Sequence, residues 1–398
     1  MKRFINKLRY IKIRDILSLF LLIPAIPCAW YLKRKRPHIW LICENGSEAR
    51  DNGYWLYRYL CMERPETDVV FVLDRHSPDY KKVSRFHREI IQPAGLVHWI
   101  YYLAAEYNIS SQKDGKPNAA VCYLFEVFGL WRNKRIFLQH GITHNDVEFL
   151  HFANTRMSLF VCGAEPEYQY VKRYFGYPPD SVRYLGFPRF DGLQSFDRKK
   201  IILIMPSWRK NIATPGNFSK RLDTPDTFIQ TKYYKAWEAF FNDPELDSFL
   251  GKAGYQIFFY PHRNMQRFLP LFQSTGRHIQ FADWKHYDVQ ELLKEAAFLI
   301  TDYSSIAMDF AYMYKPLLYY QFDEEDFRKY QYAKGYFDYE RDGFGPVCRT
   351  YQEVKAAMKT YAASDFRNAE PYMGRAKAFF SLHDGENCKR NYDAICKV

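Results

Sequence analysis

The chain has 398 residues, 19% of them aromatic, and a mean hydropathy of −0.44 that excludes a polytopic membrane protein. The formal net charge is +12, but residues 1–36 hold ten Lys or Arg and one acid, which leaves only +3 for the rest. A nucleic-acid-binding protein more often spreads its basic side chains over a folded domain, so we expect no nucleic-acid partner. The length allows two domains of ordinary size. The aromatic excess fits either a wide amphipathic surface or a substrate cleft lined with rings.

Residues 16–32 form an uncharged apolar stretch between two basic blocks. The stretch has 17 residues and contains Pro24 and Pro27, whereas a spanning helix needs about 20 apolar residues, so we expect it to be internally broken. Basic residues on both sides disfavour crossing, and those at residues 33–36 disfavour a cleavable signal peptide. We therefore predict that residues 1–36 associate with anionic lipid as an interfacial or re-entrant anchor. The alternative is an apolar helix packed on the protein's own body.

The eight cysteines are scattered, with no CxxC pair. Several lie in apolar, strand-like runs, which is typical of reduced, buried cysteines. We expect no metal site and no cofactor.

Short apolar runs alternate with helical stretches along the chain. The expected strands are residues 38–43, 68–74, 135–139 and 158–162 in the first half, and 200–205, 255–260, 297–301 and 316–320 in the second. The expected helices between them include residues 96–107, 165–175, 233–241, 288–296 and 304–314. Strands separated by helices indicate an α/β protein with parallel sheets covered on both faces.

A domain boundary is expected in residues 186–199, which are rich in turn formers and precede a fresh strand. We therefore predict Rossmann-like domains at residues 37–190 and 191–398, facing each other across a central cleft in a GT-B-like architecture. The closing helices, at 353–363 and from 371 onward, are expected to pack back on the first domain.

His140 and Gly141 directly follow the strand RIFLQ. Glycine permits a sharp turn, which would leave the imidazole exposed at the sheet edge, where a histidine can act as a general base. A structural histidine in a turn is an equal alternative. His140 and His144 have the spacing of a metal pair on a helix, but the glutamate of HExxH is missing.

Two further polar groups follow strands in the second half. Arg209, in PSWR after KIILIM, offers a forked donor suited to phosphate, or is a surface arginine stacked on Trp208. His262, in YPHR after YQIFFY, can donate to a phosphate oxygen or protonate a leaving group, or is structural.

The segment TDYSS at residues 301–305 ends a strand and begins a helix. Asp302 or Ser304 can cap that helix, whose free N–H groups favour an anion, and Ser304 and Ser305 add hydroxyl donors. Asp309, four residues past Ser305, lies on the same helix face. This pattern predicts a phosphate site, with an ordinary N-cap as the alternative.

The ordered set HG, PSWR, the histidine after YP, and TDYSSIAMDF resembles the CDP-glycerol glycerophosphotransferase family, the TagB/TagF-like enzymes of teichoic-acid synthesis. The resemblance begins near Trp40, at WLICENGSEARDNGYWLYRYL, and extends to FFSLHDGENCKRNYDAI at the end of the chain. It implies a GT-B fold at the cytoplasmic face of the bacterial membrane. It also implies a CDP-polyol donor, a lipid-linked glycan or polymer acceptor, and release of CMP.

The resemblance also implies roles for the motif residues. His140 would be the catalytic base that deprotonates the acceptor hydroxyl, and Asp309 would orient a helix or a ligand hydroxyl. The donor pyrophosphate would be held by Arg209, His262, Ser304 and Ser305, with His262 also a catalytic candidate. Further substrate-binding candidates are Gly141, Arg263, Thr301 and Asp302. Histidines, arginines and a helix end can position and neutralise phosphates without a bound metal.

Two positions depart from the family's pattern: Gln139 stands where a tryptophan is usual before HG, and Arg263 where a proline usually follows the histidine. Glycerol phosphate is the expected polyol phosphate, and ribitol phosphate or another alditol phosphate is the alternative. Two other functions stay open, a GT-B glycosyltransferase that uses a sugar nucleotide and a non-catalytic basic binding protein.

Overall fold

The computed structural model describes residues 18–113, 115–127, 129, 133–213 and 224–398. These residues divide into two compact units. The first unit takes the described residues up to Ile142, together with Glu148–Gly192 and Asp384–Val398. The second takes Thr143–Val147 and Leu193–His383.

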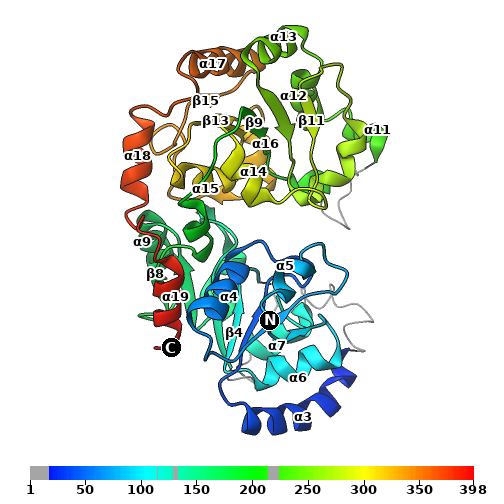
Figure 1. The fold of residues 1–398 in the computed structure, drawn as a ribbon, viewed down its shortest axis with the longest axis vertical. Helices are drawn as coiled ribbons and strands as arrows, with labels where there is room; N and C mark the ends of the chain where they lie inside the picture. Colours follow the sequence, from blue (N-terminus) through cyan, green and yellow to red (C-terminus); the bar gives the residue numbers. More distant parts are fainter. Residues whose placement is uncertain (1–17, 114, 128, 130–132, 214–223) are drawn as a thin grey trace. The chain divides into compact units, whose positions relative to one another are not determined.

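The first unit is built on a parallel sheet of seven strands in the order β3-β2-β1-β4-β5-β7-β8 (Figure 1). Its central strands are continuous apolar runs because both faces of the sheet are covered. The strands are β1 (Trp40–Cys43), β2 (Val69–Val72), β3 (Ile90–Ile91), β4 (Tyr107–Ser110), β5 (Lys134–Phe137), β7 (Leu159–Cys162) and β8 (Val182–Tyr184). The four strands predicted in this half are confirmed, whereas β3, β4 and β8 were not predicted.

The helices of the first unit are α3 (Leu22–Lys35), α4 (Asn52–Glu63), α5 (Tyr80–Ser84), α6 (Leu96–Ala104), α7 (Ala119–Val127), α8 (Phe152–Thr155), α9 (Glu165–Tyr174) and α19 (Asn387–Ile395). Two short 3₁₀ helices, η1 (Glu148–Leu150) and η2 (Pro188–Leu193), lie in its connections. The last helix, α19, begins where Asp191 accepts hydrogen bonds from the backbone N–H groups of Asn387 (2.9 Å) and Cys388 (2.7 Å).

The second unit repeats the same topology with six parallel strands in the order β11-β10-β9-β12-β13-β15. These are β9 (Ile201–Ile204), β10 (Gln256–Phe259), β11 (Ile279–Phe281), β12 (Phe298–Thr301), β13 (Leu317–Tyr320) and β15 (Val347–Cys348). A small antiparallel pair, β6 (Asn145–Asp146) with β14 (Ala333–Lys334), accompanies the sheet. In both units strand order reverses beside the first strand, which is the Rossmann arrangement. The predicted α/β fold with two Rossmann-like domains is therefore confirmed.

Helices cover both faces of the second sheet (Figure 1). They are α10 (Lys210–Ala213), α11 (Pro225–Phe228), α12 (Lys232–Phe241), α13 (Pro244–Ala253), α14 (Val289–Glu295), α15 (Ile306–Tyr312), α16 (Glu324–Tyr330), α17 (Tyr351–Ala363) and α18 (Tyr372–Phe379), with the 3₁₀ helix η3 (Arg263–Leu271). The closing helices are thus divided, because α17 and α18 belong to the second unit and α19 to the first.

Many of the abundant aromatic rings fill the core of the second unit. Trp237 of α12 is fully buried and packs against Phe240, Phe259 and Tyr320, with ring centroids 5.4–6.2 Å apart. This packing accounts for much of the aromatic content, which the sequence analysis had assigned to a surface or a cleft. Buried rings contribute large apolar areas to folding.

Helix α3 packs along α6 through one face only (Figure 1). Leu22 and Ala25 of α3 are buried in a core that includes Trp99, and Ala29 is buried as well. The helix continues through Pro24 and Pro27, and the described part of the stretch is interrupted at Leu21, a turn that precedes α3, and not at the prolines. Pro24 lies in the first turn, where its missing N–H would have no helical partner, and the contacts with α6 hold the rest. Residues 1–17, including the first basic block, lie outside the described residues.

Among the residues that the structure describes, no helix combines the length and the hydrophobicity needed to span a bilayer.

We expect Trp237→Ala to lower the free energy of unfolding by about 3–5 kcal/mol, because it empties a space in a closely packed core. Chemical denaturation followed by circular dichroism measures this change. Trp30→Ala is the matched control, because 63% of the Trp30 side-chain surface is exposed. The control should change stability by no more than about 0.5 kcal/mol. Equal effects of the two substitutions would contradict the described core.

Candidate active site

Open α/β sheets bind ligands at the carboxyl ends of their strands, near the point where the strand order reverses. This point lies between β1 and β4 in the first sheet and between β9 and β12 in the second. In the second unit the motifs at residues 206–209, 260–263 and 301–305 follow β9, β10 and β12, which are neighbours in the sheet. The structure therefore brings these three predicted motifs to one edge. His140 and Gly141 follow β5 in the first unit.

The His140 side chain is 66% exposed, as predicted for a histidine at a sheet edge. Its Nδ1 contacts Oδ2 of Asp51, a buried carboxylate. The left-handed residue of this turn is Gln139, at φ +60°, whereas Gly141 does not have a positive φ. The buried Gln139 amide holds this backbone by donating to the carbonyl of Val161 (2.6 Å) and to Glu167 (3.0 Å). A strained residue kept in place by its surroundings is common at functional sites.

Asp51 is the N-cap of α4 and binds two cationic side chains. Its Oδ1 accepts from Arg189 Nη1 at 3.0 Å and from the backbone N–H of Asn52 at 2.7 Å. Burial opposes ionisation, but the charges of His140 and Arg189 lower the pKa of Asp51 below its ordinary value. An ionised carboxylate only accepts hydrogen bonds, so His140 donates from Nδ1, and Nε2 is the basic nitrogen of the neutral ring.

Asn52 fixes the backbone that leads to His140. Its amide donates to the carbonyls of Leu138 (3.1 Å) and Gln139 (2.7 Å), and its oxygen accepts from the backbone N–H of Arg189 at 3.1 Å. The motifs of the sequence give no role to Asp51, Asn52 or Arg189. One local pattern could have indicated Asp51 and Asn52. They stand at the start of the helix that follows the first strand, where Asp is a preferred N-cap residue.

Glu44, at the end of β1, holds the same turn from inside the protein. Its buried carboxylate accepts from the backbone N–H groups of Arg50 (3.1 Å), Asp51 (3.0 Å) and Tyr54 (2.8 Å). Burial, followed by the charge of Asp51, raises the pKa of Glu44 to about 8, against the opposing effect of the backbone donors.

Arg209 is buried, and carboxylates already occupy its donors. Nε and Nη2 bind the two oxygens of Asp323 at 2.8 and 2.9 Å, and Nη1 lies 2.9 Å from Oδ2 of Asp302. The rings of Tyr303 and Phe327 lie within 5.3 Å of the guanidinium carbon. A phosphate could reach Arg209 only by displacing these partners. Arg209 therefore joins the loops that carry Asp302 and Asp323, and its direct contact with phosphate stays a prediction.

Thr301, Asp302 and Asp309 are buried too, and their predicted contact with a substrate stays a prediction. Asp302 Oδ1 accepts from the backbone N–H groups of Ser207 (2.8 Å) and Tyr303 (2.6 Å), and thus does not cap the following helix. Thr301 Oγ1 donates to the carbonyl of Met205 at 2.7 Å. These bonds join the end of β12 to the end of β9.

Ser304 and Ser305 are partly exposed at the start of α15. Ser304 Oγ accepts a long hydrogen bond of 3.4 Å from the backbone N–H of Ile306. Ser305 is the N-cap and makes no side-chain cap bond. Two hydroxyls therefore lie at the sheet edge, as the predicted phosphate site requires. Phosphate binding itself stays a prediction.

His262 is half-buried and caps η3, accepting at Nδ1 from the backbone N–H of Asn264 (3.2 Å). The neutral ring therefore carries its proton on Nε2, which makes Nε2 a donor. The ring is stacked on Trp208 with centroids 6.1 Å apart. Arg263, the residue that departs from the family's pattern, lies 3.9 Å above the Trp284 ring. Stacking on tryptophan orients the planar donor fork of an arginine.

His144, the second histidine of the suggested metal pair, belongs to the second unit, whereas His140 belongs to the first. Nε2 of His144 lies 3.1 Å from the hydroxyl of Tyr339. No group of three His, Cys, Asp or Glu side chains suited to a metal ion occurs in the part of the chain that the structure describes.

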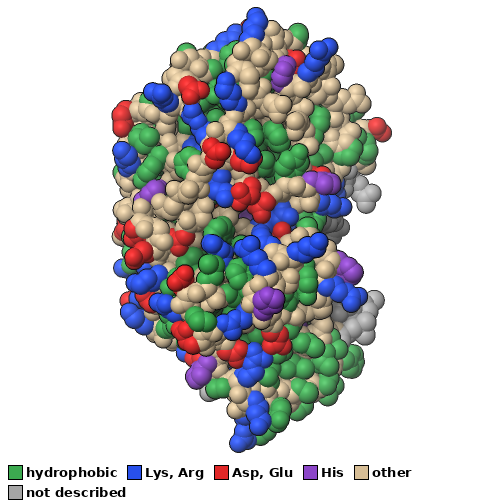
Figure 2. Space-filling view, viewed as in Figure 1, with side chains coloured by type: hydrophobic (Ala, Val, Ile, Leu, Met, Phe, Trp, Pro, Cys, Tyr) green, Lys and Arg blue, Asp and Glu red, His purple; other side chains and the backbone are tan. Residues whose placement is uncertain are grey.

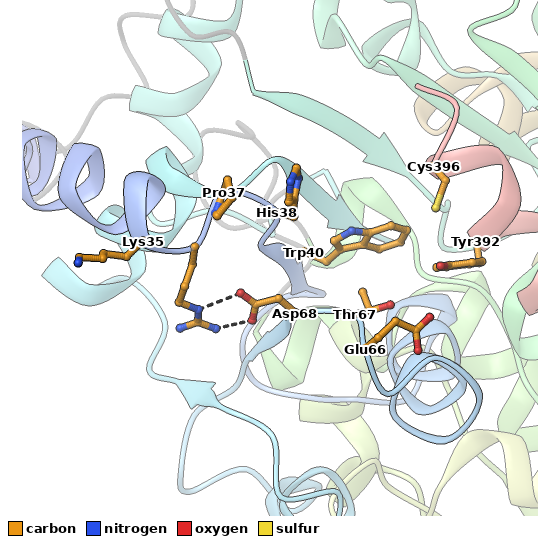
Figure 3. Close-up of a pocket in the computed structure, with 10 residues that line it drawn as sticks. Lys35, Pro37, His38, Trp40, Glu66, Thr67, Asp68, Tyr392 and Cys396 are labelled. Atoms are coloured by element: carbon orange, nitrogen blue, oxygen red, sulfur yellow. Dashed lines mark hydrogen bonds and ion pairs between the residues drawn. The ribbon is translucent and has the colours of Figure 1, made fainter.

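A pocket of about 370 Å³ lies at the opposite edge of the first sheet, beside the amino ends of β1 and β2 (Figure 3). Trp40 and Tyr392 are stacked there, with ring centroids 5.6 Å apart. Arg36, which also lines the pocket, binds Asp68 through two bonds of 2.9 and 2.5 Å. Because this edge carries none of the predicted motifs, we place no step of a reaction in the pocket.

The model of the family described as CDP-Glycerol:Poly(glycerophosphate) glycerophosphotransferase matches residues 25–397. The minor teichoic acid biosynthesis protein GgaB of Bacillus subtilis (strain 168) is 31% identical over 369 residues, which cover 91% of this chain and 40% of that protein. The teichoic acid poly(glycerol phosphate) polymerase of the same strain is 26% identical over 215 residues, 54% of this chain and 28% of that protein. The chain thus spans less than half the length of either relative.

Solved structures of similar fold include the wall teichoic acid polymerase TagF, with a TM-score of 0.62 and 15% identity, over 96% of this chain and 98% of that one. The S. aureus MnaA structure with UDP has a TM-score of 0.57 and 13% identity, over 90% of this chain and 96% of that one. These likenesses confirm the predicted GT-B-like fold.

We expect Arg209→Met to lower the free energy of unfolding by about 3–5 kcal/mol, because Asp302 and Asp323 would lose their buried counter-charge. Denaturation midpoints of the wild-type and variant proteins measure the loss. Arg349→Met is the control, since Arg349 pairs with Glu340 on the surface of the same unit and should contribute about 1 kcal/mol at most. A stable Arg209→Met variant that lost only its affinity for the donor would favour the direct phosphate role.

Proposed function

The chain belongs to the CDP-glycerol:poly(glycerophosphate) glycerophosphotransferase family, and we propose that it transfers a polyol phosphate from a CDP-activated donor. Glycerol phosphate is the first candidate, and ribitol phosphate is the second. The acceptor is a hydroxyl of a teichoic-acid-like or other cell-surface glycan carried on a lipid. The names of the two relatives support teichoic-acid chemistry.

The exposed His140 ring carries this proposal. With Nδ1 bound to Asp51, the basic Nε2 is available to take the proton of the acceptor hydroxyl. The acceptor oxygen attacks the phosphorus that bears the polyol, the bond between the two donor phosphates breaks, and CMP leaves. Gly141 has no side chain to obstruct the approach to His140. We assign the first unit, which holds His140 and Gly141, to the acceptor.

The second unit, which takes Thr143–Val147 and Leu193–His383, is assigned to the donor. His262 carries its proton on Nε2 and is suited to donate to the phosphate oxygen on which charge develops as CMP leaves. Ser304, Ser305 and Arg263 supply further donors for the two phosphates. The buried residues Arg209, Thr301, Asp302 and Asp309 hold these loops in position. In this assignment the protein's own donors neutralise the phosphates.

Purified protein should release CMP from CDP-glycerol or CDP-ribitol when native bacterial membranes are present. His140→Ala should lower the rate by about 10²- to 10⁴-fold, the usual contribution of a general base. His38→Ala is the control, because His38 is an exposed histidine of the same unit that pairs with Glu106. A screen that includes UDP-sugars separates this function from sugar transfer. The proposal fails if no CDP-alditol yields CMP.

We further propose that α3 binds the cytoplasmic surface of the cell membrane. Ile23, Ile26 and Trp30 lie on its outer face with exposures of 71%, 59% and 63%. Figure 2 shows hydrophobic side chains gathered over α3 and α6 at the lower end of the view, with Lys and Arg side chains beside them. The last turn holds Lys33, Arg34 and Lys35, which favours anionic lipid.

The double variant Ile23→Asp/Ile26→Asp should bind vesicles of phosphatidylglycerol about 10- to 100-fold more weakly, since two isoleucines no longer enter the lipid. Co-sedimentation measures the binding. Met62→Asp is the control, because Met62 is 54% exposed on α4 of the same unit and should not alter binding. Equal binding by all three proteins would rule out this surface.

A further inference from the structure

We propose that Asp51 and Arg189 act as a positioning pair for His140, holding its ring with Nδ1 protonated and Nε2 directed outward as the base. This inference rests on the proposed function and adds two residues to it. Neither residue is required to touch a substrate, because both act through the histidine. The Asp51 carboxylate is shared between the His140 ring and the Arg189 guanidinium.

The two oxygens of Asp51 have different partners. Oδ2 contacts Nδ1 of His140, and Oδ1 accepts from Arg189 Nη1 (3.0 Å) and from the backbone N–H of Asn52 (2.7 Å). The backbone N–H of Asp51 in turn donates to Glu44 at 3.0 Å. The carboxylate therefore cannot rotate without breaking bonds on both of its sides. A fixed carboxylate fixes the orientation and the tautomer of the imidazole bound to it.

Arg189 is held as firmly as the carboxylate. Its side chain is buried, and the guanidinium carbon lies 4.8 Å from the ring centre of Phe187 and 5.6 Å from that of Phe190. Its backbone N–H donates to Asn52, whose amide binds the two carbonyls that precede His140. The same small group of residues therefore fixes both the ring of the histidine and the backbone that carries it.

The charges of Asp51 and Arg189 change the pKa of His140 in opposite directions. The balance raises the pKa of His140 above its ordinary value, chiefly through the charge of Asp51 with a smaller effect from Glu48, whereas loss of solvent and the charge of Arg189 oppose the rise. A protonated ring cannot accept the acceptor's proton, so a larger rise would work against a base. Arg189 thus limits the rise in the pKa of His140 that accompanies its orientation by Asp51. Glu44 is linked to His140 through Asp51, whose backbone N–H donates to it.

An NMR titration of the full-length protein with ¹³Cε1-labelled histidine tests the pair without any substrate. His140→Gln assigns the signal. Asp51→Asn should move the titration midpoint of His140 down by about one pH unit, and Arg189→Gln should move it up, because each removes one of the opposed charges. Arg189→Lys, which retains the charge, should leave the midpoint near the wild-type value. Unchanged midpoints, or a shift in the same direction for Asp51→Asn and Arg189→Gln, would overturn the inference.

Glu106→Gln is the matched control, because it removes the carboxylate bound to another histidine of this unit, His38, and should leave the His140 signal unmoved. When CMP release is measured as a function of pH, the acidic limb of kcat/KM should shift with the NMR titration midpoint of His140 in each variant. Asp51→Asn should also lower kcat by about 10²- to 10⁴-fold. If the midpoints shift as expected and no CMP appears, the proposed function fails and the pair stands. If CMP appears and the midpoints do not move, the pair fails alone. Should Arg189→Gln not fold, the downward shift in Asp51→Asn decides.

Discussion

The contact between the His140 ring and the Asp51 carboxylate is the constraint on which the chemistry that we propose for the first unit depends. An exposed histidine has many orientations, and most of them direct no particular nitrogen at a substrate. Here the carboxylate caps α4, accepts from Arg189, and occupies Nδ1 of the ring. One orientation and one tautomer are selected together, and Nε2 becomes the basic atom. The strained Gln139 backbone, held by its buried amide, places the ring at the sheet edge.

The second unit uses a buried charge in a similar way. Arg209 lies among aromatic rings and binds Asp302 and Asp323, residues that follow two different strands. The cost of burying these three charges is offset only if every donor and acceptor is well placed. That requirement fixes the loops after β9 and β12, and Asp302 strengthens it by accepting from two backbone N–H groups. The side chains left at this sheet edge, His262, Ser304 and Ser305, are the ones suited to phosphate.

The sheets could be predicted from the sequence because their central strands are uninterrupted apolar runs, such as VVFV in β2 and IILI in β9. The edge strands could not. Ile90 and Ile91 form a two-residue strand that exists only by pairing with β2, and β8 has one exposed and one half-buried residue among its three. The continuity of α3 through Pro27 likewise depends on its contacts with α6, which no local pattern reveals.

The positions of the motifs in the candidate site could be predicted from the sequence, but the role of each side chain could not. Local sequence identified His140, His262 and the two serines because each directly follows a strand. It could not show that Arg209 is paired with Asp323, 114 positions away, or that His140 is paired with Asp51, 89 positions away. These long-range charge pairs decide which residues face a ligand and which support it. For this reason an arginine that resembled a phosphate ligand proved to be buried among carboxylates.

The most direct test of the central claim is ³¹P NMR of the purified protein with CDP-glycerol and native bacterial membranes. Transfer of a polyol phosphate predicts that the two pyrophosphate signals disappear together. They should be replaced in equal amounts by the monoester signal of CMP and a new diester signal in the membrane-linked product. Pyrophosphate signals that persist, or a second monoester in place of the diester, would contradict the account, because either result means that no acceptor hydroxyl has received the phosphate.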